Sequence, residues 1–302
     1  MKYFILFMDK VMPPIKSKSK DKNKKIVKKS ELNKVDNLNF IRNKIDVIDQ
    51  KIHKLIMQRS IYVKNIAFEK SKNTKGNSII YRPAREHKVL MALLNRHSGE
   101  FPKEVLLKLW RTMIGAYISM QGNLKVSYVS KLEVLVKDYF GITMDYNKIT
   151  NIKKSISILP NDVNHILVLP LPSNKNNWWQ NLLSINSVNI IGNLYDNLYE
   201  DTKGYILSSQ ALEFSKHNKV IYITLIKNVY ERSFDKYLSI NNYLILAKAS
   251  KTNKELIILF AKYCVSQKDA LKNLNDIKKN SVKSLIELKI IGAVSMNNKE
   301  RN

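Results

Sequence analysis

Two cationic residues, Arg59 and Lys70, are spaced so that both could reach one small anionic ligand. They lie in a stretch with helical periodicity, where their separation spans about 16 Å and returns to within about 20° of the same face. Long cationic side chains at that spacing could hold a dianion, although a lone cation on a helix is usually an ordinary surface residue. Arg42 lies about 26 Å before Arg59 and is rotated by about 100°. Arg42 therefore fits the equivalent site of a second chain, packed antiparallel, better than a site in its own chain.

An amide, Gln121, interrupts an apolar stripe in a later stretch with helical periodicity. The other members of this stripe are Trp110, Met113, Ile114, Tyr117 and Leu124. A buried amide can be a hydrogen-bonded core residue or can face a ligand, and the stripe alone leaves both interpretations open.

The remaining reactive residue types form no familiar metal or nucleophile motif. The sequence contains no P-loop, GxGxxG, HExxH or CxxC pattern. Its five histidines, His53, His87, His97, His165 and His217, do not have metal-ligand spacing. We therefore expect chemistry that needs no metal, no cofactor and no covalent intermediate.

The composition permits a folded protein of several domains and raises a second possible function. The 302-residue chain is 44% hydrophobic. Its one cysteine, Cys264, is expected to be a small buried side chain, and a single cysteine fits a protein in a reducing compartment. A formal net charge of +27 is compatible with a nucleic-acid partner. The basic residues are mostly lysine, however, whereas base readout favours arginine, and AT-rich codons also enrich Lys, Asn and Ile. Nucleic-acid binding is therefore an alternative function and not the leading hypothesis.

Long helical stretches would position the candidate residues. Residues 1–34 are predicted to be a disordered basic arm, because residues 13–34 show no apolar periodicity. A helix then runs from a cap at Asp36 or Asn37 toward Gly76. Its apolar residues recur at helical spacing and need partner helices or a second chain to be buried; they are Leu38, Ile41, Ile45, Ile48, Ile52, Leu55 and Ile56. Further helices are predicted over 84–97 and from Pro102 to about residue 125.

After about residue 129 the periodicity changes to that of strands. Buried strands are predicted over 165–172, 188–194 and 204–208, and Trp178 and Trp179 between them are expected to pack rather than to stack on a ligand. The last part reads as strand 219–226, helix 230–238, strands 242–249 and 254–264, helix 267–280 and strand 282–292. This βαββαβ order is typical of a ferredoxin-like unit. With no run of about 18 apolar residues, the chain is expected to be soluble, cytoplasmic and without membrane association.

The polar residues of the helical part, taken together, resemble a known family. The segment LNFIRNKIDVID (residues 38–49), Arg59, Lys70, the motif YRPARE (residues 81–86) and Gln121 are similar to the all-helical chorismate mutases, especially those fused to prephenate dehydratases. The resemblance covers residues 35–128. It implies an all-α, three-helix domain that forms an intertwined homodimer, within a multi-domain chain.

This resemblance implies an isomerase that converts chorismate to prephenate in aromatic amino acid biosynthesis. The reaction is a pericyclic shift, so it is accelerated by holding one conformer and by stabilising charge that develops in the transition state. Lys70 and Gln121 would donate hydrogen bonds to the ether oxygen as the C–O bond breaks. No cofactor is implied.

The resemblance also implies how chorismate is bound. Arg59 and the Arg42 of the partner chain would bind its two carboxylates, since guanidinium groups suit this task, and Arg85 would support the carboxylate end. Glu86 would accept a hydrogen bond from the ring hydroxyl. Tyr117 stands where a small serine is common, and its hydroxyl could take over the serine's hydrogen bond.

Three further positions differ from the pattern common in the family. Arg82 stands where some members have an acidic residue. Thr112 and Gly115 stand where members often have Glu and Ser. None of these differences removes a residue that the resemblance assigns to the transition state.

The C-terminal half resembles, more weakly, a prephenate dehydratase segment at residues 129–215 and an ACT regulatory domain at 216–302. Residues 138–141 (DYFG) and 165–172 carry the first likeness, and residues 290–293 (IIGA) carry the second. The Thr-Arg-Phe signature of the dehydratases is missing, the nearest stretch being residues 201–205 (DTKGY), so no dehydratase activity is expected. The ACT-like unit could bind an aromatic amino acid as effector or serve only for packing. A catalytically inactive protein that binds chorismate or an aromatic amino acid is the remaining alternative.

Overall fold

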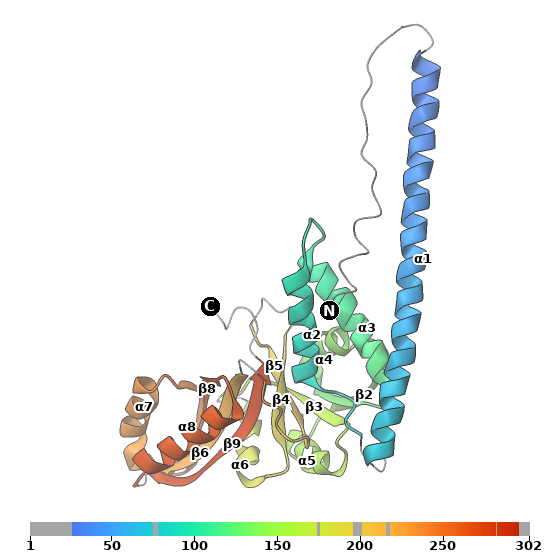
Figure 1. Ribbon diagram of the computed structural model, residues 1–302. Coiled ribbons are helices and arrows are strands. Elements are labelled where there is room, and N and C mark those ends of the chain that lie inside the picture. The colour runs from blue at the N-terminus through green and yellow to red at the C-terminus, as the bar shows by residue number, and fades with distance from the viewer. Residues whose placement is uncertain are drawn as a thin grey trace. The chain divides into compact units, whose positions relative to one another are not determined.

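The computed structural model describes residues 26–74, 78–173, 176–195, 201–215, 218–281 and 283–295 (Figure 1). The chain divides into two compact units, residues 1–59 and 60–302, and each is considered by itself. In the first unit the structure describes the N-terminal part of one long helix, α1 (Ile26–Thr74). The second unit contains the remaining helices and all of the described strands.

Helix α1 begins earlier than the sequence predicts. The sequence predicts a disordered arm over residues 26–34 and a helix start at Asp36 or Asn37, but α1 begins at Ile26. Once a helix is nucleated it extends at little cost through Lys, Glu and Leu, which are good helix formers, and no Gly or Pro interrupts these residues. Residues 1–25 of the predicted arm lie outside the described residues. None of the described helices is both long enough and apolar enough to cross a membrane.

Two helices follow α1 within the segment that resembles the mutases. Helix α2 (Pro83–Arg96) starts with a proline at its first turn, where the missing N–H carries no penalty. Helix α3 (Lys103–Ser119) ends about six residues before the predicted position. Strand β1 (Lys125–Val129) begins at that position instead, and Gly122 and Asn123, both poor helix formers, lie in the connection. The short helix α4 (Glu133–Phe140) packs against α3.

A single mixed sheet runs through the second unit, in the order β2-β1-β3-β5-β4-β9-β6-β8-β7. The strands that precede residue 210 are β1, β2 (Asp145–Ile149), β3 (His165–Pro170), β4 (Asn189–Leu194) and β5 (Gly204–Ser208). Strands β1, β2 and β3 are parallel to one another, whereas β5 is antiparallel to both β3 and β4. Short helices α5 (Ile152–Ile158) and α6 (Asn181–Ser184) lie in the connections. The helical segment is thus followed by an α/β region.

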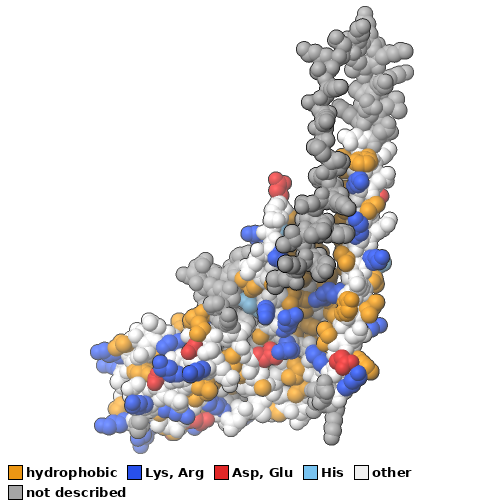
Figure 2. All heavy atoms as spheres, in the orientation of Figure 1, with side chains coloured by type: hydrophobic (Ala, Val, Ile, Leu, Met, Phe, Trp, Pro, Cys, Tyr) orange, Lys and Arg blue, Asp and Glu red, His pale blue; other side chains and the backbone are white. Residues whose placement is uncertain are grey.

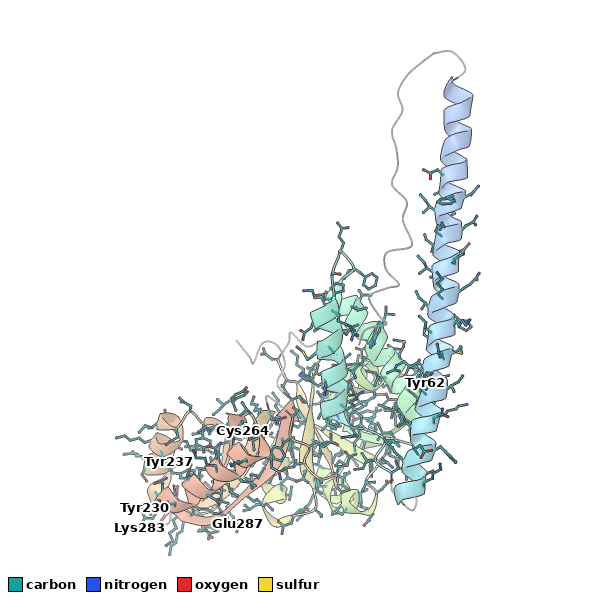
Figure 3. All side chains as sticks on the ribbon, in the orientation of Figure 1. Tyr62, Tyr230, Tyr237, Cys264, Lys283 and Glu287 are labelled. Atoms are coloured by element: carbon teal, nitrogen blue, oxygen red, sulfur yellow. The ribbon has the colours of Figure 1, made fainter. Side chains whose placement is uncertain are left out.

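The last part of the chain has the predicted βαββαβ order. Its elements are β6 (Asn218–Lys227), α7 (Glu231–Ile240), β7 (Leu244–Thr252), β8 (Glu255–Cys264), α8 (Gln267–Asn280) and β9 (Leu285–Ser295). Helices α7 and α8 cover one face of these strands (Figure 1). Cys264 is buried in the core that includes Ala270 and Ile277 of α8, as expected for a small apolar side chain (labelled in Figure 3).

Both faces of the sheet are packed. The face of β6 and β8 opposite α7 and α8 packs against Trp178 and Trp179, which are both buried, so the predicted packing role of these tryptophans is confirmed. Helices α2, α3 and α4 pack on strands β1, β3, β4 and β5. The core there includes Leu90 and Leu94 of α2, together with Ile118 of α3. The second and third helices of the mutase-like segment therefore share one core with the α/β region.

Candidate active site

Lys70 and Gln121, the two predicted hydrogen-bond donors, lie together although they are far apart in the sequence. Lys70 Nζ is 3.4 Å from Gln121 Oε1 and donates a second hydrogen bond, of 2.9 Å, to the carbonyl of Ile79. Gln121 Nε2 donates to the carbonyl of Tyr117 at 3.1 Å, and an amide nitrogen carries a second hydrogen. The stretch of α1 that leads to Lys70 borders a shallow open groove lined by Tyr62, Asn65, Ile66, Glu69 and Lys70 (Tyr62 is labelled in Figure 3).

The charge of Lys70 is set by its burial and by one neighbouring ion pair. Burial lowers the pKa of the Lys70 ammonium below its ordinary value, and the positive charge of Arg82 lowers it further. Glu213 acts in the opposite direction, and its Oε1 lies 2.6 Å from Arg82 Nε. The position that is acidic in some mutases is thus basic here, and a carboxylate from the α/β region neutralises it.

Glu86 is buried and faces a buried arginine, Arg111, that is not among the predicted site residues. Arg111 Nε lies 3.4 Å from Glu86 Oε1. The Arg111 guanidinium stacks over the ring of Tyr139 at 4.1 Å and over that of Tyr195 at 4.8 Å, and its Nη1 donates to the Tyr195 carbonyl. Burial raises the pKa of the Glu86 carboxyl above its ordinary value, and the charge of Arg111 opposes this rise. Arg111 therefore favours the ionised carboxylate that the predicted role of Glu86 requires.

The predicted carboxylate-binding arginines are placed individually. Arg42 and Arg59 both lie on α1 in the first unit, where Arg42 is exposed and Arg59 is partly buried. Arg85 lies in the first turn of α2 and is exposed. The structure thus brings Lys70 and Gln121 together, and places Glu86 in a buried ion pair.

The packing of α3 determines the surroundings of Tyr117 and Gly115. Tyr117 is buried on α3, and its carbonyl accepts the hydrogen bond from Gln121. A Cβ at Gly115 would lie 2.4 Å from the carbonyl oxygen of Phe140 in α4, closer than any real contact. The serine that is common in the mutases would not fit at position 115 in this packing.

A serine and a histidine also meet between two strands of the sheet, away from the residues described above. Ser127 Oγ lies 2.8 Å from His165 Nε2, between β1 and β3, and Asn147 Nδ2 donates to the same oxygen at 3.3 Å. Burial lowers the pKa of His165, which favours the neutral ring. Ser127 is 1% exposed, so a substrate would not reach it, and the pair satisfies buried polar groups.

The helical segment that carries these residues matches a known protein family. Residues 41–122 match the family model of chorismate mutase type II. The matched segment contains every predicted site residue and Arg111; these are Arg42, Arg59, Lys70, Arg85, Glu86, Arg111, Tyr117 and Gln121. It ends before Asn164 and Glu213, which also contact the site.

Curated relatives of this chain include bifunctional chorismate mutase/prephenate dehydratases. The chain is 28% identical over 127 residues to that of Aquifex aeolicus, a match that covers 39% of this chain and 34% of the relative. It is 30% identical over 88 residues to that of Neisseria gonorrhoeae, which covers 29% of this chain and 23% of the relative. The chain thus matches about a third or less of the length of these relatives. Among solved structures it is similar to a prephenate dehydratase from Streptococcus mutans, with 12% identity and a TM-score of 0.43 over 58% of this chain and 99% of the other.

Arg111 could have been found from the sequence. It lies four residues after Leu107 and seven before Ile118, so it interrupts a buried stripe in the same way as Gln121 does. A long cation in such a stripe needs a buried partner. Asn164 and Glu213 give no comparable signal, because both lie in polar connections far along the chain.

Proposed function

We propose that this chain is a chorismate mutase, an isomerase that converts chorismate to prephenate at a site formed by residues 35–128. The observation that carries the proposal is the approach of Lys70 Nζ to Gln121, 3.4 Å apart inside the segment that matches the mutase family. The Lys70 ammonium and the second amide hydrogen on Gln121 Nε2 supply two donors close together, which can stabilise the negative charge that grows on the ether oxygen as the C–O bond breaks. A pericyclic shift requires no nucleophile and no proton relay, and the site needs none.

The remaining roles follow the same chemistry. Arg59 and Arg85 would bind the carboxylates of chorismate, with Arg42 contributed by a second chain, and their guanidinium groups suit bidentate contacts. Glu86 would accept from the ring hydroxyl, and Tyr117 would contribute its hydroxyl to the substrate.

The loss of chorismate absorbance on adding purified protein tests the proposed activity. Lys70→Ala and Gln121→Ala should each reduce kcat by about a hundred-fold or more, as expected when a transition-state donor is removed. Lys72→Ala is the matched control, since Lys72 is an exposed cation two residues after Lys70, in the last turn of α1, paired with Glu69. Absence of turnover by the wild type, or an equal loss in Lys72→Ala, would refute the proposal.

We further propose a homodimer in which α1 of one chain supplies Arg42 to the site of the other. The support is the large apolar surface of α1, on which Phe40 is 59%, Leu55 is 62% and Tyr62 is 60% exposed (orange along α1 in Figure 2). Monomeric proteins rarely expose so much contiguous apolar surface.

Mixing two inactive variants tests the sharing of sites. Arg42→Ala and Lys70→Ala, unfolded together and refolded, should form mixed dimers in which one of the two sites keeps both residues. Random pairing makes half of the dimers mixed, so about a quarter of the wild-type activity should return. No recovery in a stable mixed dimer would place Arg42 and Lys70 in the same site of one chain.

For the C-terminal half, we propose a degenerate dehydratase-like segment at 129–215 and an ACT-like domain at 216–302. The βαββαβ order of β6 to β9 supports the second assignment, and the missing Thr-Arg-Phe signature supports the absence of dehydratase activity. Formation of phenylpyruvate from prephenate would refute the latter. A change in mutase rate on adding phenylalanine, tyrosine or tryptophan would identify an effector. A cytoplasmic location is proposed from the single buried cysteine.

A further inference from the structure

Lys70 reaches its position through a carbonyl group in the connection between α1 and α2. Its Nζ donates to the carbonyl of Ile79 at 2.9 Å, a shorter contact than the one to Gln121. A lysine side chain has about 2 kcal/mol of rotamer entropy, so a fixed acceptor restricts where its ammonium lies. The placement of this donor therefore depends on the placement of residues 78–80.

Residues 78–80 are held from outside the mutase-like segment by one side chain. Asn164 Oδ1 accepts from the backbone N–H of Ile80 at 3.1 Å, and Asn164 Nδ2 donates to the carbonyl of Ser78 at 2.9 Å. These two hydrogen bonds flank Ile79, whose carbonyl binds Lys70. Residues 78–80 are neither helix nor strand, so their backbone groups are not paired within a helix or a sheet.

Asn164 is itself well anchored. It lies directly before β3, and its backbone N–H donates to Asp162 Oδ1 at 2.8 Å. Its carbonyl accepts from the N–H of Lys125, the first residue of β1, at 3.0 Å. The carboxamide is therefore held by the edge of the sheet, and the sheet in turn holds the carbonyl that orients Lys70.

We propose that Asn164 is a positioning residue for Lys70, through which the α/β region completes the mutase site. The inference rests on the proposed chorismate mutase activity. Without the carboxamide, the Ile80 N–H and the Ser78 carbonyl lose their partner, and the Ile79 carbonyl between them can move. Lys70 would then keep its charge but lose its alignment with the breaking bond, which affects the transition state more than the binding of chorismate.

Kinetics of Asn164→Ala in the full-length protein test this proposal. We expect kcat to fall by about ten- to a hundred-fold, the loss typical of a misplacement near 1 Å, while KM changes by less than about three-fold. Asn164→Asp keeps the acceptor for Ile80 but places a carboxylate oxygen against the Ser78 carbonyl in place of the donor, so its kcat should also fall below that of wild type. Because Asp has nearly the shape of Asn, this variant also serves if Asn164→Ala does not fold.

The matched control is Asn189→Ala, since Asn189 Nδ2 donates to the carbonyl of Gln210 at 2.9 Å in the α/β region but does not contact residues 78–80. It should leave kcat unchanged. The role of Asn164 would be overturned if folded Asn164→Ala kept a kcat within about two-fold of wild type, or if Asn189→Ala lost as much. The effect of Lys70→Ala on kcat tests the mutase activity separately, so that activity could still stand. Absence of turnover by the wild type would instead remove the proposed function, and this inference with it.

Discussion

Replacing Arg111 by methionine should strongly destabilise the protein by leaving the Glu86 carboxylate buried and unpaired. Both side chains are buried, with 3.4 Å between Arg111 Nε and Glu86 Oε1. Removing one partner of a buried ion pair typically costs about 3–5 kcal/mol, because the other charge keeps its desolvation penalty. Loss of the stacking on Tyr139 and Tyr195 adds to this cost, by up to about 2 kcal/mol per contact where the cation is desolvated. The expected loss is thus a large fraction of the stability of an ordinary domain, about 5–15 kcal/mol.

Urea unfolding followed by tryptophan fluorescence measures this loss, since Trp178 and Trp179 are buried in the core of the same unit. The double variant Glu86→Gln/Arg111→Met is the control. It should recover about 2 kcal/mol relative to Arg111→Met, because no uncompensated charge remains.

The deficit of Arg111→Met should also depend on pH. Burial already raises the pKa of Glu86, and removing Arg111 raises it further, so folding favours the protonated form. The contribution of Glu86 to the stability of the variant is therefore fully present below its unfolded-state pKa and is lost as pH rises through its folded-state pKa, so the deficit relative to wild type shrinks on acidification. A deficit below about 1 kcal/mol, or one that is equal in the double variant and independent of pH, would refute the assignment of Glu86 as a buried carboxylate held by Arg111.

Three further predictions concern the site and its packing. The pH profile of kcat/KM should have its acid limb above the ordinary pKa of glutamate, because burial raises the pKa of Glu86. Its alkaline limb should lie below the ordinary pKa of lysine, because burial lowers the pKa of Lys70. Limbs at the ordinary pKa values would contradict the roles of both residues. Tyr117→Phe should lower kcat/KM by about ten-fold with an unchanged unfolding midpoint, and an unchanged rate would exclude the hydroxyl from substrate binding. Gly115→Ala should lower the free energy of unfolding, measured in urea, by about 1–3 kcal/mol. Gly122→Ala is the control and should lower it little, since its Cβ would lie 3.6 Å from Ile80. Equal effects of the two substitutions would contradict the close approach of α3 and α4.

The C-terminal half could be predicted from local patterns because its elements are long and strongly periodic. Helix α8 has the predicted bounds, and β5 does as well. The sequence pattern predicts no separate elements over residues 125–158, although these residues form β1, β2, α4 and α5. Strand β2 at the sheet edge has one buried residue among five, so it lacks the alternation that identifies a strand. Its pairing with β1 is a tertiary contact that local sequence does not encode.

The candidate site was predictable to the extent that its residues lie on α1, α2 and α3. Helical spacing and the family pattern predicted Lys70 and Gln121, and the structure brings them together. Asn164 acts on residues 84 and 86 positions before it, which no local pattern could indicate. The contact of Glu213 with Arg82 likewise spans 131 positions.

The contacts made by Asn164, Glu213 and Tyr195 explain why a region that lacks the dehydratase signature would still matter to a mutase. Each contact is modest, since a net hydrogen bond is worth about 0.5–1.5 kcal/mol and an exposed ion pair about 0–1 kcal/mol. They act on different site groups, however: the carbonyl that holds Lys70, the charge beside it, and the arginine that faces Glu86. The same region also buries the apolar faces of α2 and α3. In the proposed site, the α/β region therefore contributes to the geometry, the charge and the packing around the candidate residues.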